Sequence, residues 1–155
     1  MNDTDVLIVG AGPTGLTLAA SLLANGIKAT IVDRQAEGAN TSRAGAINAR
    51  TLEVLEGLDV ARRMVKEGVQ APRFTIRDGK KVLIPIDFST LPSAYPYTLL
   101  LPQNDTERLL LDRVVELGGD VLRPKVLATV TQDGDGITAT FDDGDVIRAA
   151  YVVGA

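Results

Sequence analysis

The chain begins with two short apolar segments, and the stretch between them is longer and also mostly apolar. Val6–Val9 and Ala29–Val32 are unbroken runs rich in β-branched residues, which is typical of parallel strands buried on both faces. Between them, polar residues recur only at every fourth position, and this spacing predicts a buried helix that ends near Gly26. The pattern therefore predicts a strand–helix–strand unit.

The middle of the chain shows less regular patterns. Its expected elements are a polar loop over 34–47, a helix from about Ala49, a second helix over Val60–Glu67, a hairpin of Arg73–Arg77 with Lys81–Ile86, and an irregular connection over 92–102. Asp78-Gly79 is the turn signal of the hairpin, and Pro85 confines its second strand to a sheet edge or a strand end.

The last third predicts one helix followed by strands. The helix starts near Gln103, with Asn104 as its N-cap and Glu107 completing a capping box. The expected strands are a three-strand antiparallel meander over Val126–Thr131, Ile137–Phe141 and Val146–Arg148, and then a separate buried parallel strand over Tyr151–Ala155. Evenly repeated strand–helix units would not produce this order.

A glycine-rich turn joins the first strand to the first helix. Gly10, Gly12 and Gly15 have the Gly-x-Gly-x-x-Gly spacing, and Asp33 ends the second strand twenty-one positions after Gly12. Glycines at these positions allow a sharp turn, close approach of a pyrophosphate and tight packing of helix on strand, while the acidic residue accepts hydrogen bonds from a ribose. The helix N-terminus attracts the phosphates through its free N–H groups and its dipole. The unit predicts a dinucleotide site.

Composition narrows the classes of partner. The chain has 155 residues, 45% of them apolar, and a formal net charge of −4. Nucleic acid is not expected as a partner, because binding a phosphate backbone requires clustered positive charge. No apolar stretch approaches the roughly 20 residues of a membrane span, and the N-terminus lacks the order of a signal peptide. We expect a cytoplasmic protein.

The chain contains no His and no Cys. This excludes Ser-His-Asp and Cys-His catalysis, thiol redox chemistry and essentially every structural zinc arrangement. We therefore expect no catalytic residue and no metal ligand in this chain, and we expect the reactive atoms to belong to a bound cofactor.

Five segments together resemble a known family. They are Val6–Gly15, Asp33-Arg34, Ser42-Arg43-Ala44, Asn48–Glu53, and Leu101-Pro102-Gln103 followed by Glu107 and Leu110. The chain is similar to the N-terminal, FAD-binding part of the group A FAD-dependent aromatic-compound monooxygenases, of the para-hydroxybenzoate and phenol hydroxylase type. The resemblance implies FAD as cofactor, NAD(P)H as electron donor, O₂ as oxidant and a small aromatic substrate.

The resemblance also implies roles for single residues. Gly10, Gly12 and Gly15 bind the pyrophosphate together with Pro13 and Thr14 at the helix start, and Asp33 holds the adenosine ribose. The remaining expected cofactor residues are Arg34 against the adenine, Arg43 near FAD or the nicotinamide, and Gln103 near the ribityl and phosphate groups. Read without the resemblance, both arginines are also compatible with solvated loop charges and Gln103 with an ordinary loop hydrogen bond.

The predicted fold is α/β: a Rossmann-like FAD-binding domain with a parallel sheet, an antiparallel three-strand meander and an inserted hairpin. We expect residues 1–68 and 103–155 to form the nucleotide-binding core, and 69–102 to be an excursion toward a substrate domain. Members of the family run several hundred residues, so we expect a truncated domain, inactive in isolation. Apolar strand faces left uncovered would favour self-association.

Three functional hypotheses follow. The first is the FAD-binding portion of an aromatic hydroxylase. The second is a nucleotide-binding module without catalysis, and the third is an NAD(P)-dependent dehydrogenase domain, which does not explain the hairpin and the meander. Halogenases, epoxidases and reductases that share this FAD domain also stay open, as do the substrate and the choice between NADH and NADPH.

Overall fold

A computed structural model describes residues 3–38 and 45–155 of the chain. The chain divides into two compact units. The first unit combines Met1–Thr41 with Glu107–Ala155, and the second is Ser42–Thr106.

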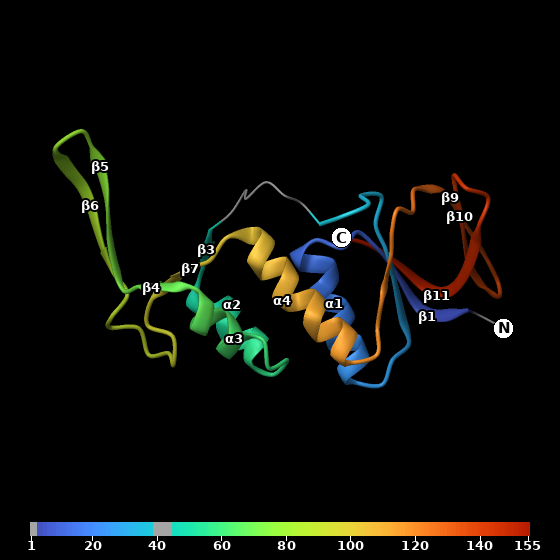
Figure 1. The fold of residues 1–155 in the computed structure, drawn as a ribbon, viewed down its shortest axis with the longest axis horizontal. Coiled ribbons are helices and arrows are strands. Elements are labelled where there is room, and N and C mark those ends of the chain that lie inside the picture. Colours follow the sequence, from blue (N-terminus) through green and yellow to red (C-terminus); the bar gives the residue numbers. More distant parts are fainter. Residues whose placement is uncertain (1–2, 39–44) are drawn as a thin grey trace. The chain divides into compact units, whose positions relative to one another are not determined.

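The first unit is built on a six-stranded sheet in the order β8-β2-β1-β11-β10-β9. Figure 1 labels β1, β11, β10 and β9 of this sheet. Its strands are β1 (Thr4–Val9), β2 (Ala29–Val32), β8 (Val121–Leu122), β9 (Leu127–Asp133), β10 (Gly136–Phe141) and β11 (Val146–Gly154). The first four strands of this order run parallel, and β10 and β9 continue the sheet in antiparallel fashion. The predicted combination of a parallel sheet with an antiparallel meander is confirmed.

Two details of this sheet differ from the prediction. Val146–Arg148 and Tyr151–Ala155 were predicted as separate strands, but β11 is one continuous strand that pairs with β10 on one side and with β1 on the other. The two predicted strands are separated only by Ala149 and Ala150. Both residues are compatible with an extended backbone, so the strand continues through them. The second difference is β8, a two-residue parallel strand beside β2 that is too short to show a periodic pattern.

Helix α1 (Pro13–Ala24) follows β1 and buries Gly15, Leu16, Ala19 and Ala20. It contacts β1 and β2. Gly26 follows its C-terminus with a φ of +75°, a left-handed conformation that favours glycine. The predicted strand–helix–strand unit is confirmed.

Helix α4 (Gln103–Glu116) begins at the predicted residue, but two residues before Asp105, where an N-cap at Asn104 would place the first helical residue. The carbonyl of Pro102 accepts hydrogen bonds from the N–H groups of Asp105 and Thr106, at 3.1 and 3.0 Å. Asn104 therefore lies within the first turn, and its assignment as N-cap was wrong. Glu107 is nevertheless buried.

One apolar cluster of the first unit joins the parallel strands to the meander. It contains Leu7, Val32, Ala139, Phe141 and Ala149, and Val9, Leu127, Ile147 and Val152 pack against it. The ammonium group of Lys125 lies 5.6 Å from the centre of the Phe141 ring and is bonded to Asp143 and Asp145.

The second unit contains two helices, a three-stranded sheet and a hairpin. Its elements are α2 (Ala49–Glu56), α3 (Ala61–Glu67), the antiparallel sheet β3-β7-β4 (Ala46–Ile47, Thr98–Leu100, Val69–Ala71), and the hairpin of β5 (Arg73–Asp78) with β6 (Lys81–Asp87). Asn48 caps α2, since its side chain accepts the Thr51 N–H at 2.9 Å. The expectation of an irregular connection over 92–102 was wrong at β7, because partners distant in sequence, β3 and β4, pair with it on both sides.

The β5–β6 hairpin is exposed along almost its whole length, including Phe74, Ile76 and Ile84. It forms a sheet of only two strands, so both are edge strands, and this agrees with the expectation for Pro85. Within the described ranges, no helix combines the length and apolarity needed to cross a membrane.

The buried cluster predicts a strong dependence of stability on Phe141, which is 2% exposed. Phe141→Ala should lower the free energy of unfolding by about 3–5 kcal/mol, because it leaves a cavity between the meander and the parallel strands. Tyr151→Ala, on β11 but 68% exposed, should cost less than about 1 kcal/mol. Urea unfolding followed by circular dichroism measures both; equal losses would contradict the assigned core.

Candidate functional site

The turn between β1 and α1 brings three backbone segments into close contact. Gly10 has a φ of +118°, and its N–H donates to the carbonyl of Val32 at 2.8 Å. A Cβ on Gly10 would lie 2.0 Å from the carbonyl oxygen of Ala155, and a Cβ on Gly15 would lie 2.0 Å from that of Gly10. Any side chain at these two positions would displace the backbone, so packing requires both glycines.

Gly12 differs from the other two glycines of the turn. Among the described residues, no atom lies within 4 Å of the position of a Cβ there. Gly12 is the N-cap of α1, no side chain caps this helix end, and Pro13 occupies the first helical position. The first turn therefore presents N–H groups to an open space, which is the arrangement that binds phosphate at helix N-termini. The geometry fits a diphosphate at a place that a side chain would fill.

Asp33 is hydrogen-bonded to this turn. Its Oδ2 accepts the N–H of Ala11 at 2.7 Å, and its Oδ1 accepts the N–H of Gln35 at 2.7 Å. The carboxylate thus fixes the glycine turn and the loop that leaves β2. Each oxygen keeps a further lone pair, so the group can also accept hydrogen bonds from ribose hydroxyls.

Arg123 is a residue of this site that sequence reasoning missed. It follows β8, and its Nη2 donates to the carbonyl of Ala11 at 3.4 Å. Only the position of β8 beside β2 brings it here, and this two-residue strand gives no pattern in the sequence.

The other predicted residues are placed as follows. Pro13 begins α1, Thr14 is exposed in its first turn, and Arg34 is exposed directly after Asp33. Gln103 is half-buried at the start of α4 and belongs to the second unit. Arg43 lies outside the described residues. The structure thus brings the glycines, Pro13, Thr14 and Asp33 together, and the cofactor-binding roles of all the predicted residues stay predictions.

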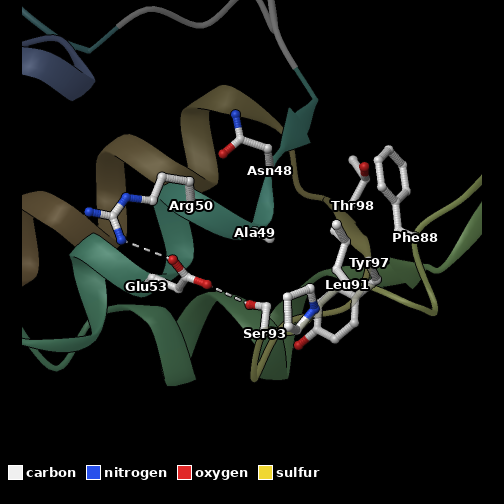
Figure 2. A pocket seen from close by; sticks show the side chains of 10 residues that line it. Asn48, Ala49, Arg50, Glu53, Phe88, Leu91, Ser93, Tyr97 and Thr98 are labelled. Carbon is white, nitrogen blue, oxygen red and sulfur yellow. Dashed lines mark hydrogen bonds and ion pairs between the residues drawn. The ribbon is translucent and has the colours of Figure 1, made fainter.

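The second unit contains a separate pocket of about 420 Å³ between the start of α2 and the segment before β7 (Figure 2). Its lining residues are Asn48, Ala49, Arg50, Glu53, Phe88, Leu91, Pro92, Ser93, Tyr97 and Thr98. Glu53 accepts hydrogen bonds from Ser93 at 2.7 Å and from Arg50 at 3.1 Å, and these bonds hold the pKa of Glu53 below its ordinary value. Burial raises the pKa of Tyr97. At neutral pH the pocket therefore holds an ionised carboxylate and a neutral phenol. Among the described residues, no group of three or more carboxylates is placed to hold a metal ion.

Comparison with known proteins identifies the class. The profile of the FAD binding domain family matches residues 3–155, and the chain belongs to this family. It is 39% identical to 12-dehydrotetracycline 5-monooxygenase/anhydrotetracycline 6-monooxygenase of Streptomyces rimosus, over 97% of this chain and 30% of the relative. It is 35% identical to pentachlorophenol 4-monooxygenase of Sphingobium chlorophenolicum, over 99% of this chain and 30% of the relative.

A solved structure agrees with this assignment. The anhydrotetracycline hydroxylase OxyS of Streptomyces rimosus superposes with a TM-score of 0.87 at 35% identity, over 98% of this chain and 31% of that protein. The resemblance to the FAD-binding part of flavin-dependent aromatic-compound monooxygenases is therefore confirmed. The chain spans about 30% of the length of the relatives it matches.

The contrast among the glycines gives a prediction about stability. Gly15→Ala should lower the free energy of unfolding by about 2 kcal/mol or more, because its Cβ collides with the backbone of Gly10. Gly12→Ala should cost less than about 1 kcal/mol, since only a cap preference changes. Thermal unfolding of the two variants measures the difference. A Gly12→Ala variant as unstable as Gly15→Ala would show that the space at Gly12 is filled by protein.

Proposed function

We propose that this chain binds the ADP half of FAD at the turn between β1 and α1. The observation that carries the proposal is the open space at Gly12, lined by the uncapped start of α1 and flanked by the Asp33 carboxylate. The N–H groups of Thr14 and Gly15 would hold the diphosphate through hydrogen bonds and the helix dipole. Asp33 would accept hydrogen bonds from the adenosine ribose.

Three further residues complete the proposed cofactor site. Arg34 follows Asp33 directly and is exposed, so its planar guanidinium is available to stack on the adenine. Arg43 and Gln103 would contact more distant parts of the FAD or, for Arg43, the nicotinamide donor. Their support is the match of the surrounding sequence to the family.

We further propose that the chain serves a flavin-dependent monooxygenase that hydroxylates a small aromatic compound with NAD(P)H and O₂. FAD supplies the redox and oxygen chemistry when it is bound, and the residues of this chain bind and orient it. The relatives named for tetracycline intermediates and for pentachlorophenol support an aromatic substrate. Residues 69–102 would form the excursion toward a substrate domain. The exposed apolar side chains of the β5–β6 hairpin, including Phe74, support that placement.

A nucleotide-binding module without catalysis is the second candidate for the chain in isolation. Its support is the site at the start of α1, whose backbone N–H groups and Asp33 carboxylate are groups that bind a nucleotide. Self-association of the isolated chain through its uncovered apolar faces is part of this candidate.

Titration of the purified chain with FAD tests the proposed site. The unmodified chain should quench flavin fluorescence in a saturable manner and should co-elute with FAD. Gly12→Val should abolish binding without unfolding the protein, because its side chain fills the space for the diphosphate. Gly134→Val is the matched control. Gly134 lies in the β9–β10 turn, and a Cβ there would likewise meet no atom of the described part of the chain within 4 Å.

Three results would contradict this proposal. If Gly12→Val binds FAD with unchanged affinity, the diphosphate does not bind at the glycine turn. Equal loss in Gly134→Val would attribute the effect to general destabilisation. Binding of NADH without binding of FAD would favour the dehydrogenase hypothesis.

A further inference from the structure

We propose that Arg123 is a further cation of the dinucleotide site, besides Arg34 and Arg43, and that its guanidinium group binds the diphosphate of the ligand. This inference rests on the proposed function. It adds a charged side chain to a site in which the glycine turn itself offers only backbone N–H groups.

The position of Arg123 is fixed by the backbone on both sides. The N–H of Asp33 donates to the carbonyl of Leu122 at 3.1 Å, and the N–H of Lys125 donates to the carbonyl of Asp33 at 2.7 Å. Arg123 lies between these two hydrogen bonds. It therefore follows β8 at the same sheet edge at which Asp33 follows β2, and ligands of open parallel sheets bind at this carboxyl edge.

The side chain of Arg123 extends from this edge to the glycine turn. Its Nη2 contacts the carbonyl of Ala11 at 3.4 Å, which is longer than an ordinary N–H···O bond. Its Nη1 lies 3.6 Å from the position of a Cβ on Gly38, and Oε2 of the buried Glu107 lies 3.5 Å from the same position. The guanidinium thus lies where the turn and the loop after β2 approach each other.

The donors of this guanidinium are incompletely used. Its Nε is buried and has no hydrogen-bond partner within the described parts of the chain. The ion pairs that the structure shows over residues 3–38 and 45–155 do not include Arg123. The neighbouring cation Lys125 is instead bonded to Asp143 and Asp145. A partly buried arginine stays charged, and its planar fork matches phosphate oxygens.

Charge balance points to the same ligand. The amide of Ala11 donates to the Asp33 carboxylate, and the carbonyl of Ala11 accepts from Arg123. A diphosphate placed at this turn brings further negative charge next to Asp33, in a chain whose net charge is already −4. The positive charge of Arg123 offsets the repulsion between the diphosphate and Asp33. The helix dipole also offsets it, but it supplies only a partial positive charge.

The test measures binding of FAD, ADP and adenosine to the full chain by calorimetry. In Arg123→Met, the affinity for FAD and for ADP should fall by about ten- to a hundredfold, the range for hydrogen bonds to charged groups. The affinity for adenosine, which carries no phosphate, should change by less than about threefold. Added KCl should weaken ADP binding to the unmodified chain more steeply than to Arg123→Met, because the screened charge pair is absent from the variant.

Two further variants separate charge from packing. Arg123→Lys keeps the charge and should keep most of the salt dependence while losing part of the affinity. Arg148→Met is the matched control. The Nε of Arg148 is also buried without a partner among the described residues. Arg148 lies away from the glycine turn, because its neighbour Ala149 pairs with Thr4 at the end of β1 that is opposite to the turn. This control should bind ADP like the unmodified chain.

The possible failures are distinguishable. An unmodified chain that binds neither FAD nor ADP overturns the proposed function. An unmodified chain that binds both, while Arg123→Met binds ADP equally well, overturns only the role of Arg123. A parallel loss of adenosine and ADP affinity, with an unchanged salt dependence, also overturns it and assigns Arg123 to holding the turn in place. If Arg123→Met does not fold, retained salt dependence in Arg123→Lys supports the proposal and its loss contradicts it.

Discussion

The approach of three backbone segments at the end of β1 is the constraint on which the first unit depends. Gly10 bonds to Val32 at the end of β2, while the N–H of Ala155 donates to Val9 at 2.9 Å. Carbonyl oxygens lie only 2.0 Å from where side chains would begin at Gly10 and Gly15. Because the segments are so close, α1 must start directly above the central strand. The close approaches at Gly10 and Gly15 adjoin Gly12, where a Cβ would meet no atom of the described residues within 4 Å.

The charged groups around this turn come from the ends of neighbouring strands. Asp33 ends β2 and Arg123 follows β8, and both are hydrogen-bonded to Ala11. Parallel strands place their carboxyl ends at the same edge of the sheet. Asp33 and Arg123 are far apart in the sequence, but they lie close together because each directly follows one of two neighbouring strands. The same sheet continues through β11 into the meander, whose Phe141 packs in one cluster with Leu7 and Val32. Core packing and ligand site thus share the same strands.

The sequence predicted best what is local. The strand–helix–strand unit, the end of α1 at Gly26 and the hairpin around Asp78-Gly79 all depend on neighbours along the chain, and the structure agrees with them. The glycine turn and Asp33 were also predictable, because their spacing is set by one such unit.

The missed features depend on pairing between distant segments. β7 and β8 are short strands defined only by their partners, and β11 is continuous because two different strands pair with its two parts. Arg123 is separated from Ala11 by 112 positions, so no local pattern connects it with the glycine turn. The start of α4 near Gln103 was predicted correctly, but its N-cap was placed two residues too late, at Asn104. The carbonyl of Pro102 already accepts the first hydrogen bonds of the helix.

The proposed function depends on a diphosphate binding at the start of α1. Titration of the ¹⁵N-labelled chain with ADP, followed by amide NMR, tests this most directly. We expect the largest shifts at the amides of Ala11, Gly12, Thr14 and Gly15, and we expect the amides of the β9–β10 turn to stay unchanged. Saturable binding with its largest shifts outside the glycine turn, or no shift at ADP concentrations that saturate calorimetric binding, would contradict it.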